Sequence, residues 1–324
     1  MIRPFEIRDI PTLHQYRQRG LFLDSVPTLT WGRTLVPMGA AFSPLSNVTG
    51  VFTSIYQDDS DPGAAPIVGQ VSHASGASFA RFTFIAPDAA IESPALSPLL
   101  EHLIQRVGAR GAQSLVAEVD EKTHTFEALR RATFSIYSRQ RIWRLAAAPE
   151  SSGASLWRPG EAIHEFDQRR LYNMLVPALV QQVEPVHMGS QGWVLYEDGE
   201  LRAFASVQTG PRGIWVQPFI HPEMLEVTAR LADLIQRLGP KTARPVYICL
   251  RSYTAWLADA MQDLGAEPGP GQAVMVRRLA TEVRKPVRQA LPAINGGAEP
   301  VQHMQPEKLI HPARGRKQQR SRHR

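Results

Sequence analysis

Residues 103–108 read LIQRVG, and residues 234–239, which lie 131 positions later, read LIQRLG. The leucine, isoleucine and valine residues in and before each hexamer recur at the spacing of one helix face. Both hexamers end in glycine, the residue most common just past a helix end. The sequence therefore predicts two amphipathic helices with nearly identical C-terminal parts, each ending at its glycine.

The segments around the two hexamers correspond as well. Each helix is preceded by a predicted strand, at 79–87 and 213–222, and followed by a buried strand, at 113–119 and 244–250. Farther along, each copy has a helix and a closing strand, predicted at 124–132 and 139–145 and at 253–265 and 273–279. The offset of 131 holds through the helix, the glycine and the next strand, which indicates a tandem repeat of a mixed α/β domain.

Composition divides the chain further. A stretch of small and turn-forming residues at 147–155 predicts a linker between a first domain at 1–146 and a second at 156–281. Residues 284–324 contain ten Lys or Arg and two Asp or Glu, whereas the rest of the chain is nearly neutral. We expect a disordered basic tail at 282–324, because its few large apolar residues cannot offset the entropy of ordering. The interpretation that we favour for this tail is that it keeps the protein soluble. The alternative is that its basic residues make a weak contact with nucleic acid or with an acidic surface.

Several classes of protein are disfavoured. No apolar run is long enough for a membrane helix, and the charged N-terminus differs from a signal peptide, so we expect a cytoplasmic protein without membrane contact. One cysteine, Cys249, excludes an intrachain disulfide and a cysteine-based zinc cage, and no metal site is expected. The sequence leaves the oligomeric state open.

The order strand, helix, hairpin, strand, helix, strand, helix, strand resembles the GNAT superfamily of acyl-CoA N-acyltransferases. The opening IRPFEIRDIPTL at residues 2–13 looks like the first strand and helix of that family. The stretch from FIAP at 84–87 to LVAEV at 115–119 looks like its acyl-CoA-binding strand–helix–strand unit. The resemblance covers both halves, and it implies two GNAT-like domains, each a mostly antiparallel sheet flanked by helices.

Two signatures of the family are missing from both halves. The Gln/Arg-x-x-Gly-x-Gly/Ala turn that holds the CoA pyrophosphate aligns with residues 91–96 (IESPAL), where Pro94 removes a backbone donor, and with residues 222–227 (PEMLEV). The tyrosine that acts as general acid in many relatives aligns with Leu129 and Met261, while Tyr137 and Tyr253 are out of register. The phosphate site is therefore expected to be degenerate.

The resemblance also implies where a donor would bind. A pantetheine arm would pair with the backbone of the strand before the helix, which predicts cofactor-binding positions in both halves: Phe84, Ile85 and Ala86 in the first, Phe219 and Ile220 in the second. Acylation of an amine needs a general base that takes up a proton from it. The candidate catalytic residues are His73, Glu118 and His221. For each of them, an ordinary structural role is the alternative. Asp120 ends the same strand as Glu118 and shares its interpretation.

Two functions remain open on these observations. The first is a divergent N-acyltransferase that moves an acyl group from acetyl-CoA or another acyl-CoA to an amine on a small molecule or a protein. The second is a catalytically inactive GNAT-like module for binding or assembly. The retained double architecture favours the first, and the missing signatures favour the second.

Overall fold

A computed structural model describes residues 1–16, 19–33, 39–40, 46–61, 63–150, 156–185 and 192–279. The predicted tail, and the possible contact of that tail with nucleic acid, lie outside these residues. We call residues 2–145 the first half and residues 157–278 the second half; both belong to one compact unit, Met1–Thr281. No helix in the described part of the chain combines the length and the apolar character needed to cross a membrane.

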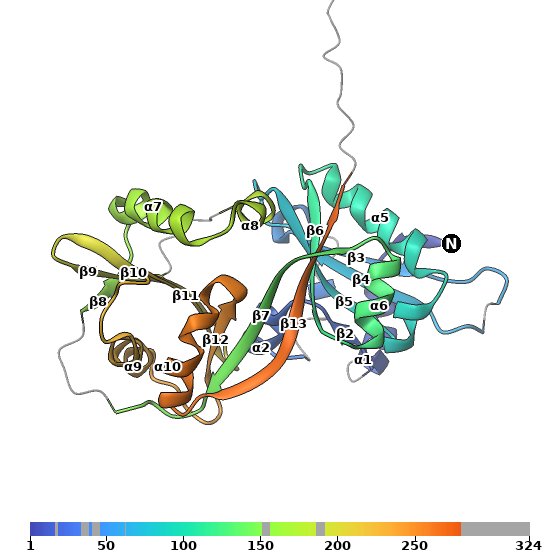
Figure 1. The fold of residues 1–324 in the computed structure, drawn as a ribbon. Helices are drawn as coiled ribbons and strands as arrows, with labels where there is room; N and C mark the ends of the chain where they lie inside the picture. Colours follow the sequence, from blue (N-terminus) through green and yellow to red (C-terminus); the bar gives the residue numbers. More distant parts are fainter. Residues whose placement is uncertain are drawn as a thin grey trace, which may run out of the picture. The chain divides into compact units, whose positions relative to one another are not determined.

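The two halves contain similar elements in a similar order (Figure 1). The first half contains β1 (Ile2–Pro4), η1 (Ile7–Asp9), α1 (Ile10–Tyr16), β2 (Leu21–Phe22), α2 (Ser25–Thr30), α4 (Ser46–Thr49), β3 (Val51–Tyr56), β4 (Ile67–Ser72), β5 (Phe79–Ala86), η3 (Asp88–Glu92), α5 (Leu96–Gly108), β6 (Ser114–Asp120), α6 (His124–Arg131) and β7 (Ser135–Leu145). The second half contains β8 (Trp157–Pro159), η4 (Ala162–His164), α7 (Glu165–Leu175), α8 (Ala178–Val183), β9 (Gly192–Glu197), β10 (Glu200–Thr209), β11 (Ile214–Ile220), α9 (Val227–Leu238), β12 (Val246–Arg251), η5 (Ser252–Leu257), α10 (Ala258–Asp263) and β13 (Glu267–Arg278). The predicted mixed α/β class is confirmed.

The repeated hexamers lie at the ends of α5 and α9, but the two helices end differently. Gly239 caps α9 with φ near 60°, as the sequence predicts. The corresponding Gly108 is the last residue of α5, and the next residue, Ala109, forms a right-handed cap. The chain then turns at Gly111, whose φ is 98°. Both helices therefore end at or next to the hexamer glycine, but only Gly239 has the left-handed backbone of a glycine cap.

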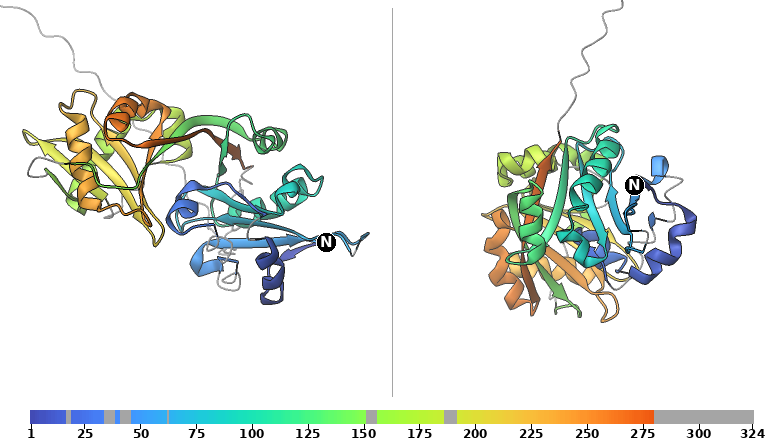
Figure 2. Two further views of the ribbon diagram at one scale, coloured as in Figure 1. Left: turned by 90° about the horizontal axis from the view of Figure 1, so that it is seen from below. Right: turned by 90° about the vertical axis from the view of Figure 1, so that its right-hand side faces the viewer.

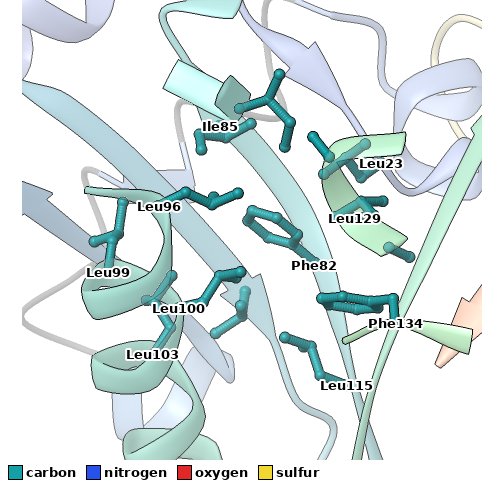
Figure 3. Packing of buried hydrophobic residues seen from close by; sticks show 14 of the residues in the cluster. Leu23, Phe82, Ile85, Leu96, Leu99, Leu100, Leu103, Leu115, Leu129 and Phe134 are labelled. Atoms are coloured by element: carbon teal, nitrogen blue, oxygen red, sulfur yellow. The ribbon is translucent and has the colours of Figure 1, made fainter. Parts of the chain in front are cut away.

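Each hexamer helix packs its apolar side onto one face of the sheet. In the first half, Leu99, Leu100 and Leu103 of α5 pack around Phe82 of β5, and Leu129 of α6 closes the cluster (Figure 3). Burying a side chain of this size contributes roughly 2 kcal/mol. Leu231, Leu234 and Ile235 of α9 occupy the matching place in the second half. The same apolar face therefore occurs in both helices, because each helix covers an equivalent face of the sheet in its own half.

The closing strands of the two halves are exchanged. The strand order is β1-β3-β4-β5-β6-β13-β7-β12-β11-β10-β9-β8, so β13 of the second half lies between β6 and β7 of the first. Met275 of β13 is paired with Ala117 of β6, and Ile248 of β12 is paired with Trp143 of β7. Figure 1 and the two views in Figure 2 show β13, in orange, beside β7, in green. Neither half therefore completes its sheet from its own residues, and the division into domains at 146 and 156 stays a prediction.

The exchange can be tested by dividing the chain within residues 151–155. Residues 1–150 expressed alone should lack a cooperative unfolding transition, because β6 and β7 would have no β13 between them. Co-expression with residues 156–281 should restore one complex with one transition, measured by circular dichroism during heating. A cooperative transition of residues 1–150 alone would contradict the exchange.

Candidate functional site

In each half two parallel strands separate toward their C-terminal ends. In the first half β5 and β6 pair only from Phe79 opposite Ser114 to Arg81 opposite Val116. In the second half β11 and β12 pair only from Ile214 opposite Val246 to Val216 opposite Ile248. Beyond these pairs the strands diverge, and backbone groups on their facing edges need other partners.

The opening in the first half is filled by the chain itself. Leu21 and Phe22 of β2 pair antiparallel with Ile85 and Phe84 of β5. The next residue, Leu23, donates its N–H to the Thr83 carbonyl (3.0 Å) and accepts from the Glu118 N–H (2.8 Å). The edge of β5 at Phe84 and Ile85, which was predicted to bind the acyl donor, thus already pairs with β2. On the other edge of β5, Ala86 pairs with Val68 of β4.

The second half has no such filling strand among its described residues. In the first half β2 lies between α1 and α2, but in the second half α7 and α8 are joined directly by Val176 and Pro177. Phe219 and Ile220 of β11 pair with Phe204 and Ala203 of β10 on one edge only. Among the described residues, no strand therefore pairs with the edge of β11 that faces β12 beyond Val216.

A chamber of about 380 Å³ lies beside the second opening. Its wall includes an aromatic group in which Phe219 stacks on Phe204 with ring centroids 4.5 Å apart and contacts Tyr172 at 5.5 Å. The full lining consists of Ser72, Ala74, Ala77, Phe79 and Arg81 from the first half and Tyr172, Val180, Glu184, Pro185, Phe204, Ser206, Gln208, Gln217, Phe219 and Tyr253 from the second. Both halves thus contribute to one chamber.

Glu184 joins the two halves at the side of this chamber. One of its carboxylate oxygens accepts from Arg81 of β5 (2.8 Å) and the other accepts from Arg251 at the end of β12 (3.0 Å). The second guanidinium nitrogen of Arg81 contacts Glu118 (3.2 Å) and lies 3.8 Å from Asp24. All five side chains are buried or nearly so, which makes their charges strongly interdependent.

The buried charges shift several pKa values in opposite directions. Burial and the neighbouring Glu118 raise the pKa of Asp24 to about 7, although Arg81 opposes this shift. Burial would also raise the pKa of Glu184, but Arg251 and Arg81 lower it below its usual value. Burial raises the pKa of Tyr253, so this phenol keeps its proton at neutral pH. The chamber therefore presents an ionised carboxylate and a protonated phenol.

The three predicted catalytic residues lie in three different places. His73 is buried, and its Nε2 lies 2.8 Å from the Ala77 carbonyl oxygen. Glu118 lines a different pocket and is held by Arg81 and by the Ser25 N–H (3.0 Å). His221 borders a small pocket of about 140 Å³ beside α7, where its Nδ1 accepts from the Glu223 N–H. The structure does not bring them together, and their catalytic role stays a prediction.

Sequence reasoning missed Glu184, Arg81 and Arg251. A usable signal existed for the two arginines, because each is a single charge in or directly after an apolar strand. Arg251 also stands 131 positions after Asp120, so the repeat itself pairs an acidic strand end with a basic one. Glu184 follows α8 in a polar segment, and nothing in its immediate sequence distinguishes it.

The turns that would hold a donor pyrophosphate are acidic. Before α5 the chain forms η3, which contains Asp88 and Glu92, and α5 begins after Ala95 without a side-chain cap. Before α9, Glu226 has a left-handed backbone (φ 53°) and its carboxylate pairs with Arg230 at 3.4 Å. These carboxylates repel phosphate at short range. Within the described residues, no group of three or more His, Cys, Asp or Glu could hold a metal ion.

Comparison with known proteins identifies the fold. No family model and no curated protein matches the sequence. Among solved structures, a GCN5-related N-acetyltransferase from Sphaerobacter thermophilus matches 86% of this chain and 95% of its own, with a TM-score of 0.52 and 10% identity. A tandem GNAT protein from the clavulanic acid biosynthesis pathway matches 86% of this chain and 98% of its own, with a TM-score of 0.50 and 14% identity. The chain has the tandem GNAT fold, as the sequence predicted.

Replacing Glu184 should reveal how strongly it holds the halves together. Glu184→Gln leaves two buried guanidinium groups without their shared carboxylate, so we expect a loss of about 3 kcal/mol in the free energy of unfolding, measured with urea. The matched control is Glu267→Gln, which breaks an exposed pair with Arg144 and should cost about 0.5 kcal/mol or less. Equal losses in the two variants would contradict the central role of Glu184.

The titration of Asp24 should lower the free energy of unfolding as the pH rises. Its folded-state pKa of about 7 lies above the ordinary value of 3.8, so between these pH values the unfolded chain releases a proton that the folded chain retains. Asp24→Asn removes the titration and keeps an oxygen to accept from the Val26 N–H. The free energy of unfolding of the natural chain minus that of the variant should decrease from pH 4 to pH 7, measured with urea. A constant or increasing difference would contradict the raised pKa.

Proposed function

Starting from the tandem GNAT fold, we propose that this chain is an N-acyltransferase that takes an acyl group from acyl-CoA and delivers it to a small-molecule amine. The observation that carries the proposal is the second opening, where β11 and β12 separate beside a chamber and no described strand fills the space. The donor would supply an activated thioester, and the chain would supply the positions at which donor and amine meet.

The second opening fits the amide-bearing arm of an acyl-CoA better than the first. An extended arm can pair with a free strand edge in the way that a peptide adds to a sheet. Phe219 and Ile220 belong to such an edge, whereas Phe84 and Ile85 already pair with β2. The acidic residues Glu223 and Glu226 near α9 do not fit the pyrophosphate end. We therefore expect donor affinity to come mainly from the arm.

The chamber suits an amine with an apolar body. Phe204, Phe219 and Tyr172 offer aromatic faces to an apolar or cationic group, and Gln217 and Ser206 offer hydrogen-bonding groups. The volume of about 380 Å³ matches a small molecule and is small for a folded protein segment. This supports a small-molecule acceptor over a protein acceptor.

Tyr253 is the residue best suited to protonate the departing thiolate. It lines the chamber, and its phenol oxygen lies 3.4 Å from Nε2 of Gln217, a residue on the diverging part of β11. Burial keeps this phenol protonated, as a general acid requires. The low pKa of Glu184 makes that carboxylate a weak base, and both of its oxygens already accept from Arg81 and Arg251, so its role here is to hold these two arginines beside the chamber. The amine would react in its neutral form, and the proton that it releases when the amide forms would replace the one that Tyr253 gives to the thiolate.

Activity is tested by thiol release from acetyl-CoA in the presence of a panel of small amines. Tyr253→Phe should lower kcat about a hundredfold, since positioned acid catalysis contributes at least that much. Tyr56→Phe, in β3 of the first half, is the matched control and should leave kcat unchanged. Equal rates in the two variants would exclude Tyr253 as the acid.

Donor location is tested by hydrogen exchange on the same samples. Acetyl-CoA should slow exchange in peptides that contain Phe219 and Ile220 and should leave peptides that contain Phe84 and Ile85 unchanged. Absence of both thiol release and exchange protection would favour the inactive binding or assembly module. Protection without thiol release would locate a binding site and refute the enzyme.

A further inference from the structure

Three arginines line a second, separate pocket of about 710 Å³. Arg33 follows α2, Arg144 lies on β7, and Arg212 lies in the turn between β10 and β11. The remaining lining residues are Thr28, Leu29, Trp31, Gly32, Thr242, Ala243, Pro245 and Tyr247, so no carboxylate of the described chain lines this pocket. None of these residues lines the chamber next to Tyr253.

The pocket is built by the contact of α2 with the second half. The Arg212 N–H donates to the Thr30 carbonyl at 2.9 Å, which fixes the turn against the end of α2. Gly213 permits the close approach, since a Cβ there would lie 2.6 Å from the Tyr247 ring and 2.7 Å from the Leu29 carbonyl oxygen. The backbones that carry Arg33 and Arg212 are therefore held near each other by packing.

The positive charge in this pocket is only partly compensated. Arg144 pairs with Glu267 at 2.7 Å, and that glutamate side chain is 71% exposed. The Arg33 guanidinium lies 4.9 Å from the centre of the Phe22 ring. Neither Arg33 nor Arg212 has a carboxylate within salt-bridge distance in the described part of the chain. A bound anion would compensate the charges of Arg33 and Arg212.

An apolar space adjoins the arginines. A pocket of about 700 Å³ shares Thr28, Leu29, Arg33, Arg144 and Tyr247 with the first, so the two are continuous. Its further walls include the apolar residues Leu21, Phe22, Leu23, Val119, Ile142 and Pro268, and three carboxylates, Glu118, Asp120 and Glu267, also line it. The combined groove therefore has the three arginines and no carboxylate in one part, and apolar side chains together with three carboxylates in the other.

We propose that this groove binds a small molecule that has a phosphate group attached to an apolar or aromatic body. A phosphate dianion can accept from more than one guanidinium at once, which matches three arginines from three elements. The phosphate would lie among the arginines, and the apolar body would lie against Leu21, Phe22 and Ile142 in the adjoining part. The arginine-lined part of the groove shares no lining residue with the acyl-transfer chamber.

The test is calorimetric titration of the full chain with phenyl phosphate, inorganic phosphate and benzoate at low ionic strength. Phenyl phosphate should bind most tightly, because it alone combines the dianion with an apolar ring. Arg212→Gln and Arg33→Gln should each weaken its binding about tenfold, the loss expected for one charge-assisted hydrogen bond. Arg212→Lys keeps the charge and should weaken binding less than Arg212→Gln.

Arg169→Gln is the matched control, because Arg169 is an exposed arginine on α7 outside both parts of the groove. It should leave the affinity for phenyl phosphate unchanged, and circular dichroism should show all variants folded. Equal binding by the natural chain and the Arg33→Gln/Arg212→Gln double variant would assign binding to other basic residues and overturn the proposal. Benzoate binding as tightly as phenyl phosphate would overturn the phosphate assignment.

Discussion

The antiparallel pairing of β7 with β13 is the constraint on which the other features depend. It places the last strand of each half against the penultimate strand of the other, so that one continuous sheet runs through both halves. That sheet holds Arg81 and Arg251 on opposite sides of the junction, close enough for Glu184 to contact both. It also holds Arg144 of the first half beside Tyr247 of the second. Both candidate sites thus consist of residues that only the shared sheet brings together.

The buried charges at the junction have a structural role apart from any chemistry. A buried ion pair contributes little net stability when both partners are present. Removing one partner is strongly destabilising, because the other charge is then buried and unpaired. The group of Asp24, Arg81, Glu118, Glu184 and Arg251 draws on both halves and on segments far apart in sequence. A misregistered junction would leave at least one of these charges buried and unpaired. The network therefore favours a single arrangement of the halves more than it adds to overall stability.

Much of the fold was predictable because it depends on local periodicity and repetition. The apolar spacing of residues 96–107 and the offset of 131 were enough to predict α5, α9, the strands on either side of them and the duplication, but not β2 or α2. The strand exchange was not predictable from the sequence. The alternation of apolar and polar residues in β13 would be the same if β13 paired with strands of its own half or with strands of the first half. The site was less accessible still. Arg81 and Glu184 are 103 residues apart, and only their meeting in space indicates a role. His73, Glu118 and His221 fit a chemical role by residue type, but type alone does not reveal which pocket each one faces.

The filling of the first opening by β2 has a consequence for stoichiometry. A duplicated chain begins with two equivalent openings and with the capacity for cooperative binding between them. Leu21–Phe22 is tethered to the strand it pairs with, so its effective concentration is far above that of a dissolved competitor. Any extended ligand would have to displace this segment to pair with the same edge of β5. The second opening was not closed in this way, because Val176 and Pro177 leave no length of chain to insert. Among the described residues, the duplicated chain therefore has one opening with an unpaired strand edge and one whose edge is already paired, so the two halves are not equivalent.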